Sequence, residues 1–268
     1  PMYATYTGLI SASGAVMVPV PLEQEKGFEL TKDNIISKIT PRTRVILLNS
    51  PHNPTGAVLS HQRMQEIIDL AEKHDLWILS DEVYDEMLFD GVQFISPLSF
   101  PKAEERVVVV SSISKSHAAP GFRSGWSVGS VEFTKRLLPL AETMLFGNQP
   151  FIADMTAKAL SKPSKVAAEM RKKYADRAHR IYTCLNGIAG LHINQPKAGM
   201  FVLIDVSSTG MSGESFAFDL LEKTGVAVMP GSSFGSELDK WVRVALTVED
   251  DAFDTACQRI AKYSLSKV

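Results

Sequence analysis

The sequence predicts an α/β fold, with a larger domain built on a mainly parallel sheet and a smaller α+β domain after it. Three observations lead to this prediction. Apolar runs at 44–49, 76–79 and 107–110 show no alternation, as expected of strands covered on both faces of a sheet. A helical pattern separates the first two runs, which favours parallel strands with right-handed crossovers. Beyond residue 200 the strand–helix repeat gives way to a different mixture.

The first third of the chain is expected to alternate strands and helices. A strand candidate at 16–20 is followed by a short helix over 31–39, with Thr31 as its N-cap. Ser60 is placed to cap the next helix, because apolar residues recur after it at helical spacing. The residues on that apolar face are Met64, Ile67, Ile68 and Ala71.

A brief strand at 126–128 and a helix over 133–144 are predicted next, before the longest helical stretch, 162–186, with Pro163 near its first turn. One face of this stretch is basic. We interpret it as a solvated face rather than a surface for an acidic partner, because no aromatic residues interleave with the charges. The basic residues are Lys165, Arg171, Lys172, Lys173, Arg177 and Arg180.

The C-terminal part is predicted to form the smaller α+β domain. Its expected strands are 201–206, 226–229 and 241–246, and its expected helices are 214–223 and 252–263. We therefore place the larger domain at 1–160, and the long helix with the smaller domain at 161–268.

Composition excludes several classes of function. The 268 residues include 28 basic and 30 acidic ones, so no electrostatic footprint for nucleic acid or a membrane appears. Two cysteines suggest a reducing compartment, and neither a membrane span nor a signal peptide is recognisable, so we expect a cytoplasmic protein. The six histidines lack metal-site spacing, and no metal is predicted.

The segment 111–126 carries the strongest chemical signal. It follows the buried run 107–110, and open α/β sheets bind ligands outside the carboxyl ends of their strands. Lys115 is preceded by the hydroxyls of Ser112 and Ser114 and followed eight residues later by Arg123. This combination suits an amine nucleophile beside an anion cradle, in which hydroxyls and a guanidinium bind a phosphate.

The segment resembles the Schiff-base lysine motif of fold-type I aminotransferases that use pyridoxal 5′-phosphate (PLP), S-x-S-K followed after seven residues by R-x-G. Two upstream stretches, each directly after a predicted strand, match further signatures of that family. They are the N-P-T-G sequence at 53–56 and the Asp81-Glu82-Val83-Tyr84 sequence. The resemblance extends over essentially the whole chain and implies the aspartate aminotransferase-like fold.

For the cofactor, the resemblance implies a role for each matching residue. Lys115 would form the Schiff base and move a proton between the substrate and the cofactor, for which it needs a lowered pKa. The Asp81 carboxylate would keep the ring nitrogen protonated, so that the ring accepts electrons. Asn53 and Tyr84 would bind the 3′-oxygen of the ring. The phosphate would be held by Ser112, Ser114 and Arg123, with Gly121 and Gly125 allowing close backbone approach.

Two further residues complete the implied site. Arg243 lies in an apolar predicted strand, where an arginine is uncommon unless it is paired, and the resemblance makes it the clamp on the substrate α-carboxylate. Asn53 would also contact the substrate. Tyr3 matches the aromatic residue that stacks on the cofactor ring. His52 and His117 are interpreted as neighbours of the motifs without a role of their own.

The beginning of the chain departs from the family pattern. Relatives carry a further segment before the equivalent of Pro1, with a phosphate-binding turn at a helix N-terminus, a dimer-forming arm and a tyrosine that reaches the partner's phosphate. We expect that this chain is part of a longer protein and lacks part of the phosphate site and of the dimer interface. The full-length protein is expected to be a homodimer.

The leading hypothesis is an amino-acid aminotransferase that moves an amino group from an L-amino acid to a 2-oxo acid by a ping-pong mechanism. A PLP-dependent C–S lyase of the same fold is one alternative, although the Arg123–Trp126 ending of the lysine segment favours the transaminase. An aminotransferase-like sensor domain of a transcription regulator, and an inactive fragment with a structural role, remain open. The stretch 144–152 is similar to that of arginine–pyruvate transaminases, while aspartate, aromatic amino acids and alanine stay possible substrates.

Overall fold

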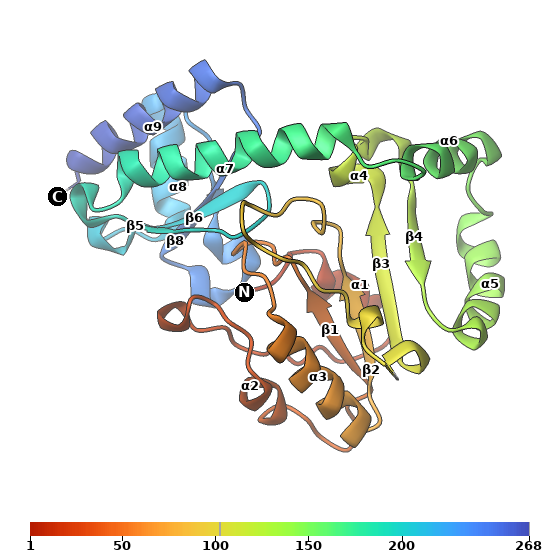
Figure 1. Cartoon of the computed structure of the whole chain (residues 1–268). Coiled ribbons are helices and arrows are strands. Elements are labelled where there is room, and N and C mark those ends of the chain that lie inside the picture. The colour runs from red at the N-terminus through yellow and green to blue at the C-terminus, as the bar shows by residue number, and fades with distance from the viewer. Residues whose placement is uncertain (102, 268) are drawn as a thin grey trace. The chain divides into compact units, whose positions relative to one another are not determined.

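The computed structural model describes residues 1–101 and 103–267. The chain divides into two compact units (Figure 1). We call residues 30–51 and 58–171 the lysine unit, and residues 1–29, 52–57 and 172–268 the arginine unit. The arginine unit thus takes in two segments from the N-terminal part of the chain. The domain boundary expected between residues 160 and 161 stays a prediction for the complete protein.

The lysine unit contains a four-stranded sheet in the order β1-β2-β3-β4. Its strands are β1 (Val45–Asn49), β2 (Trp77–Asp81), β3 (Val107–Ser112) and β4 (Gly125–Val128). The first three strands are parallel, and β4 runs antiparallel to β3 (Figure 1). The predicted α/β fold with a mainly parallel sheet is therefore confirmed.

Two helices of this unit begin where the sequence places their caps. In α2 (Lys32–Ile36), Thr31 and Asn34 form a capping box. In α3 (His61–Lys73), the Ser60 hydroxyl accepts a hydrogen bond from Arg63 N, and the whole predicted apolar face is buried. Between β2 and β3, however, the described residues form no α-helix, and the helical turns there are the 3₁₀ turns η2 (Pro97–Ser99) and η3 (Ala103–Glu105).

Helices of different lengths follow β3. They are α4 (Ile113–Ser116), η4 (Pro120–Phe122), α5 (Val131–Leu145) and α6 (Pro150–Leu160), and α7 (Lys165–Leu185) comes after them. The predicted helix over 133–144 corresponds to α5, and the longest predicted helix corresponds to α7. Helix α6 was not predicted, because Gly147 and Pro150 make the sequence around them typical of a loop.

The arginine unit confirms the smaller α+β domain. Its sheet is antiparallel, in the order β5 (His192–Asn194), β6 (Phe201–Asp205), β8 (Trp241–Ala245) and β7 (Met229–Pro230). The α-helices α1 (Tyr6–Ala12), α8 (Gly213–Thr224) and α9 (Asp250–Leu265) belong to it. Its 3₁₀ turns are η1 (Gln24–Lys26), η5 (Ile188–Gly190), η6 (Ser207–Thr209), η7 (Gly231–Phe234) and η8 (Ser236–Leu238).

Two strand predictions were wrong in part or in full. No strand forms at 16–20, where Pro19 removes a backbone donor that a sheet would need. The strand expected at 226–229 is reduced to Met229–Pro230, because the backbone nitrogen of Val226 instead donates to the Thr224 hydroxyl beyond the end of α8. The N-terminal segment contributes to the core of the unit by another route: Phe28 packs edge-on against Trp241.

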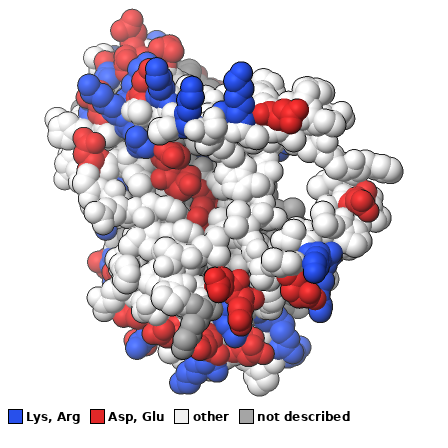
Figure 2. Space-filling view, turned by 45° about the vertical axis from the view of Figure 1, so that its right-hand side comes forward, with Lys and Arg blue, Asp and Glu red and all other residues white. Residues whose placement is uncertain are grey.

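The expectation of a solvated basic face on α7 is correct only for its lysines. Lys165, Lys172 and Lys173 are exposed, and a row of basic side chains crosses the upper part of the face drawn in Figure 2. Arg177, in contrast, is 3% exposed. Arg180 is bonded to acidic residues of α7 and α9, so the arginines have a structural use that the spacing of charges did not reveal.

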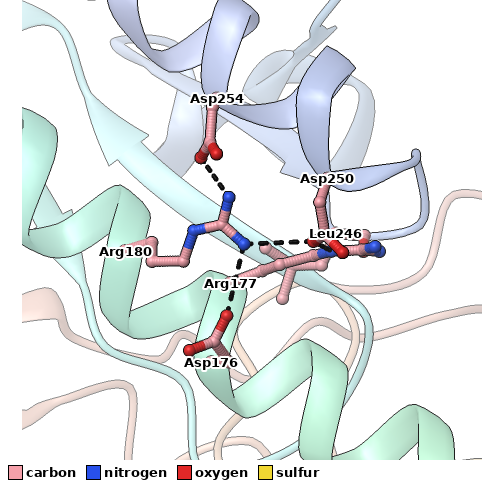
Figure 3. Close-up of polar contacts among 6 residues, drawn as sticks. All are labelled: Asp176, Arg177, Arg180, Leu246, Asp250 and Asp254. Carbon is pink, nitrogen blue, oxygen red and sulfur yellow. Dashed lines mark hydrogen bonds and ion pairs between the residues drawn. The ribbon is translucent and has the colours of Figure 1, made fainter.

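These arginines join α7 to the residues after β8 (Figure 3). Arg177 Nε donates to Asp250 Oδ1 over 2.9 Å, and its Nη1 donates to the Leu246 carbonyl over 2.7 Å. Arg180 donates to Asp176, Asp250 and Asp254. Hydrogen bonds from Arg177, followed by those from Arg180, hold the pKa of Asp250 below its ordinary value.

Replacing Arg177 by alanine should lower the free energy of unfolding by about 3 kcal/mol, because it removes one partner of a buried charged contact and leaves the space of its stem empty. Urea denaturation of both proteins measures the difference. The matched control is Asp176→Asn, since Asp176 lies at the exposed end of the same network, and it should cost less than about 0.5 kcal/mol. Equal effects for the two variants would contradict the structural role of Arg177.

No helix within residues 1–101 and 103–267 combines the length and the hydrophobicity needed to cross a bilayer.

Candidate active site

Polar residues end the parallel strands of the lysine unit on one edge of its sheet. Asn49 lies opposite Asp81 at the ends of β1 and β2, and Asp81 lies opposite Val110, two residues before the end of β3. The Asn49 side chain donates to the Asp81 carbonyl over 3.2 Å, and the backbone nitrogen of Ser50 donates to the same oxygen. The sheet therefore holds the Asp81 backbone rigidly where α/β sheets bind ligands.

Lys115 lies in the turn that leaves β3. The Ser112 hydroxyl accepts a hydrogen bond from the Ser114 nitrogen over 3.3 Å and so caps the single turn of α4. The far end of that turn is fixed by Ser164, whose hydroxyl donates to the Ser116 carbonyl over 2.6 Å. Lys115 is half-buried, and local bonds at both ends of its turn define its position.

Arg123 follows on the same loop in a left-handed conformation, with φ at +51°. Its Nη1 donates to the Pro120 carbonyl over 2.9 Å, and the residue is exposed. A Cβ atom at Gly125 would lie 2.8 Å from the Ser111 carbonyl oxygen, so no larger residue fits there without movement. The R-x-G spacing of the sequence thus reflects how closely β4 starts against β3.

The turn after β2 holds a second carboxylate that sequence reasoning passed over. Asp81 Oδ1 accepts a hydrogen bond from the Val83 nitrogen, and Tyr84 is buried. Between them, Glu82 is 5% exposed and accepts hydrogen bonds of 2.9 Å from the hydroxyls of Ser80 and Ser96. Burial raises the pKa of Glu82 to about 7. In the sequence, the signal for this buried carboxylate is the pair of adjacent acidic residues, Asp81 and Glu82, at the end of an apolar strand.

In the arginine unit, two of the predicted residues are in contact although 190 positions separate them. Arg243 Nη1 donates to Asn53 Oδ1 over 3.0 Å, and Asn53 is buried. The guanidinium lies over the rings of Phe201 and Phe234, at 5.2 and 4.5 Å from their centroids. Because β8 lies between β6 and β7, Arg243 is not on an edge strand.

The loop that carries Asn53 is fixed within the arginine unit. His52 Nδ1 and the Thr55 hydroxyl are 2.7 Å apart, and the Asn194 side chain donates to the Thr55 carbonyl over 2.8 Å. Gly56 has a φ of +70°, and a Cβ there would collide with Pro196 at 2.3 Å. The Asn53–Pro54 peptide bond is cis, as is Ser50–Pro51.

The structure thus brings the predicted residues together in two groups. Asp81, Tyr84 and the lysine loop with its two serines and Arg123 lie in the lysine unit; Asn53 and Arg243 lie in the arginine unit. Tyr3 is also in the arginine unit, where it packs edge-on against Tyr6 at 5.5 Å and is 38% exposed. Within the described residues, no group of three or more His, Cys, Asp and Glu side chains could hold a metal ion.

The chemistry of these groups fits PLP. The amine in the capped turn matches an aldehyde, and the carboxylate at the end of the neighbouring parallel strand matches a ring nitrogen. The hydroxyls and the exposed guanidinium match a phosphate. The fold and these residues together are those of the fold-type I class of PLP-dependent proteins.

Comparisons with known proteins give the family. The family model for aminotransferases of class I and II matches residues 1–260, and the chain belongs to this family, whose members depend on PLP. Over 261 residues it is 42% identical to the arginine–pyruvate transaminase of Pseudomonas aeruginosa, covering 97% of this chain and 66% of the relative. It is 32% identical to an aromatic-amino-acid aminotransferase of Thermococcus litoralis, covering 98% and 68%. The chain thus spans about two thirds of the length of these relatives.

Solved structures agree with this assignment. The aromatic aminotransferase of Pyrococcus horikoshii superposes with a TM-score of 0.94 at 31% identity, over 98% of this chain and 71% of that chain. A double mutant of Thermus thermophilus aspartate aminotransferase gives 0.89 at 30% identity, over 98% and 68%. The predicted aspartate aminotransferase-like fold is confirmed.

Replacing Glu82 by glutamine should stabilise the protein only at higher pH. The folded-state pKa is raised above its ordinary value of 4.5, so between about pH 4.5 and 7 the folded state keeps a proton that the unfolded state releases. Stability therefore falls as the pH rises through this window. Above pH 7 the variant should be more stable by up to about 3 kcal/mol, and below pH 4.5 the difference should vanish.

Urea denaturation from pH 4 to 9 measures the effect of this substitution. The exposed Glu72 of α3 provides the matched control, and Glu72→Gln should change the free energy of unfolding by less than about 0.5 kcal/mol. A difference between the Glu82 variant and the unchanged protein that does not depend on pH would contradict a buried, titrating carboxyl group.

Proposed function

We propose that the protein containing this chain is a PLP-dependent amino-acid aminotransferase, which moves the amino group of an L-amino acid to a 2-oxo acid by a ping-pong mechanism. The observation that carries the proposal is the placement of Lys115. It lies in a capped turn directly after β3, and β3 pairs in parallel with β2, which ends at Asp81. Membership of the class I and II family supports the same activity.

The bound cofactor supplies an electron-accepting ring that weakens the bonds at the substrate α-carbon. In the lysine unit, we assign Lys115 as the amine that holds the cofactor covalently and later moves a proton at the α-carbon. The Asp81 carboxylate holds the proton on the ring nitrogen, and its backbone is fixed by Asn49 and Ser50. Ser112, Ser114 and Arg123 bind the phosphate.

We assign the remaining roles by resemblance to the family. Asn53 and Tyr84 would hold the 3′-oxygen of the ring, Tyr3 would contact the ring, and Arg243 would bind the α-carboxylate of the substrate. The contact between Arg243 Nη1 and Asn53 Oδ1 supports this arrangement, because it fixes the direction of both side chains at once. The aromatic rings on Arg243 also limit its rotation.

For the substrate, we propose L-arginine with pyruvate as the first pair to test. The name of the relative that is 42% identical supports it, since that protein is an arginine–pyruvate transaminase. The aspartate and aromatic aminotransferases among the other relatives make those amino acids the next donors to test. We further propose that the complete protein is a cytoplasmic homodimer, with the domain boundary near residue 160.

The activity is tested by the absorbance spectrum of the protein with PLP, before and after each amino acid of a panel is added. A donor should convert the cofactor from its aldehyde-derived to its amine-derived absorbance, and pyruvate should reverse the change. Lys115→Ala should abolish both changes, because it removes the amine that we assign to the cofactor. Pyruvate formed from cysteine-type substrates without such conversion would instead support the C–S lyase, and no cofactor absorbance at all would overturn the enzyme.

Replacing Arg243 by lysine should weaken binding of the substrate more than binding of the cofactor. Lysine keeps the charge but cannot form two parallel hydrogen bonds to a carboxylate, so KM for the amino acid should rise by about 10- to 100-fold. Steady-state kinetics measures KM, and a PLP titration measures cofactor affinity, which should stay within about threefold. If PLP affinity falls by the same factor as KM rises, Arg243 does not act on the substrate carboxylate.

A further inference from the structure

We propose that Thr156, on helix α6, is a positioning residue for Arg123 and thereby for recognition of the cofactor phosphate. The inference rests on the proposed function, in which Arg123 binds that phosphate. Thr156 acts through Ser124, the residue that follows Arg123 in the chain.

The two side chains form a buried pair of hydroxyl groups. Ser124 Oγ and Thr156 Oγ1 are 2.8 Å apart, and the residues are 4% and 8% exposed. The Thr156 hydroxyl lies 2.7 Å from the Ile152 carbonyl and donates to it. Because a hydroxyl has one hydrogen, Thr156 must accept from Ser124, which fixes the direction of the whole chain of bonds.

The burial of residues on helix α6 supports a structural role for this pair of hydroxyls. Thr156 is the one buried residue of this eleven-residue helix, whereas Phe151 is 69% and Leu160 47% exposed. A helix that docked through apolar packing would bury its large side chains instead. Here a hydroxyl occupies the buried position and takes part in two hydrogen bonds, which a valine of similar volume could not form.

Arg123 needs such support because of its backbone. A left-handed φ of +51° is unfavourable for a residue with a Cβ, and it persists only where the surroundings enforce it. The side chain is bonded to the Pro120 carbonyl on one side. On the other side, Ser124 is held by Thr156, and its carbonyl accepts from the Ile113 nitrogen at the start of the lysine turn. The exposed guanidinium is thus carried by a backbone that is fixed from both directions.

The test compares PLP with pyridoxal, which lacks the phosphate. Thr156→Val should weaken PLP binding by about tenfold, roughly the value of one hydrogen bond, while pyridoxal binding stays within about twofold. Thr156→Ser keeps the hydroxyl and should bind both compounds like the unchanged protein. Equilibrium dialysis gives the two affinities without any measurement of activity. Equal weakening of both compounds would overturn the proposal.

A second variant separates positioning from stability. Ser124→Ala with Thr156→Val removes both hydroxyls, so no buried group is left unpaired and the thermal midpoint should return toward that of the unchanged protein. PLP binding should remain weak, because the anchor of the Arg123 backbone is still missing. If PLP binding recovers together with the midpoint, stability alone explains the effect and the inference is wrong.

Arg123→Gln distinguishes a failure of this inference from a failure of the proposed function. If this variant loses the preference for PLP over pyridoxal while Thr156→Val keeps it, the phosphate role of Arg123 stands and the role of Thr156 falls. If the unchanged protein binds PLP and pyridoxal equally, or binds neither, the assignment of Arg123 fails and the inference fails with it.

Discussion

The parallel register of β1, β2 and β3 is the constraint on which the rest of the lysine unit depends. Since Asn49 is aligned with Asp81, and Asp81 with Val110, the chain leaves all three strands along one edge of the sheet. Parallel pairing places the polar groups at the carboxyl ends of the strands, whereas burial alternates along the apolar residues of β1 and β2. A carboxylate and an amine that are 34 positions apart in sequence thereby follow adjacent strands.

Polar anchors, rather than apolar packing, define the loops beyond that edge. Ser112 caps the lysine turn, Ser164 bonds its far end, and the Ser124–Thr156 pair fixes the loop after Arg123. A hydrogen bond sets direction as well as distance, whereas an apolar contact permits sliding. Loops that must hold an amine and a guanidinium at defined positions benefit from this difference. The cost is that each buried hydroxyl depends on its partner, so single substitutions there should be disproportionately harmful.

Much of this architecture follows from local sequence signals. The caps at Thr31 and Ser60 and the positions of β1 to β3 were predictable, since each depends on a few neighbouring residues. Burial on both faces holds only for the first half of β3, because burial alternates along β1 and β2. The lysine motif was predictable because its spacing mirrors the close start of β4 at Gly125. Contacts between distant residues could not be derived from the sequence. Glu82 with Ser96, and Thr156 with Ser124, each pair groups on different segments, and no periodicity reports them.

The arginines show most clearly why residue type alone did not define roles. Arg177 looked like part of a solvated stripe, yet it is buried between Asp250 and the Leu246 carbonyl, which satisfy its charge and its donors. Arg123 is exposed, and its described partner, the Pro120 carbonyl, is uncharged. A guanidinium that already has a carboxylate gains little from a second anion, whereas one that is bonded to a neutral carbonyl keeps its charge for an anionic ligand. The charge of the partner, which only the structure reveals, therefore separates an arginine that supports the fold from one suited to bind a phosphate.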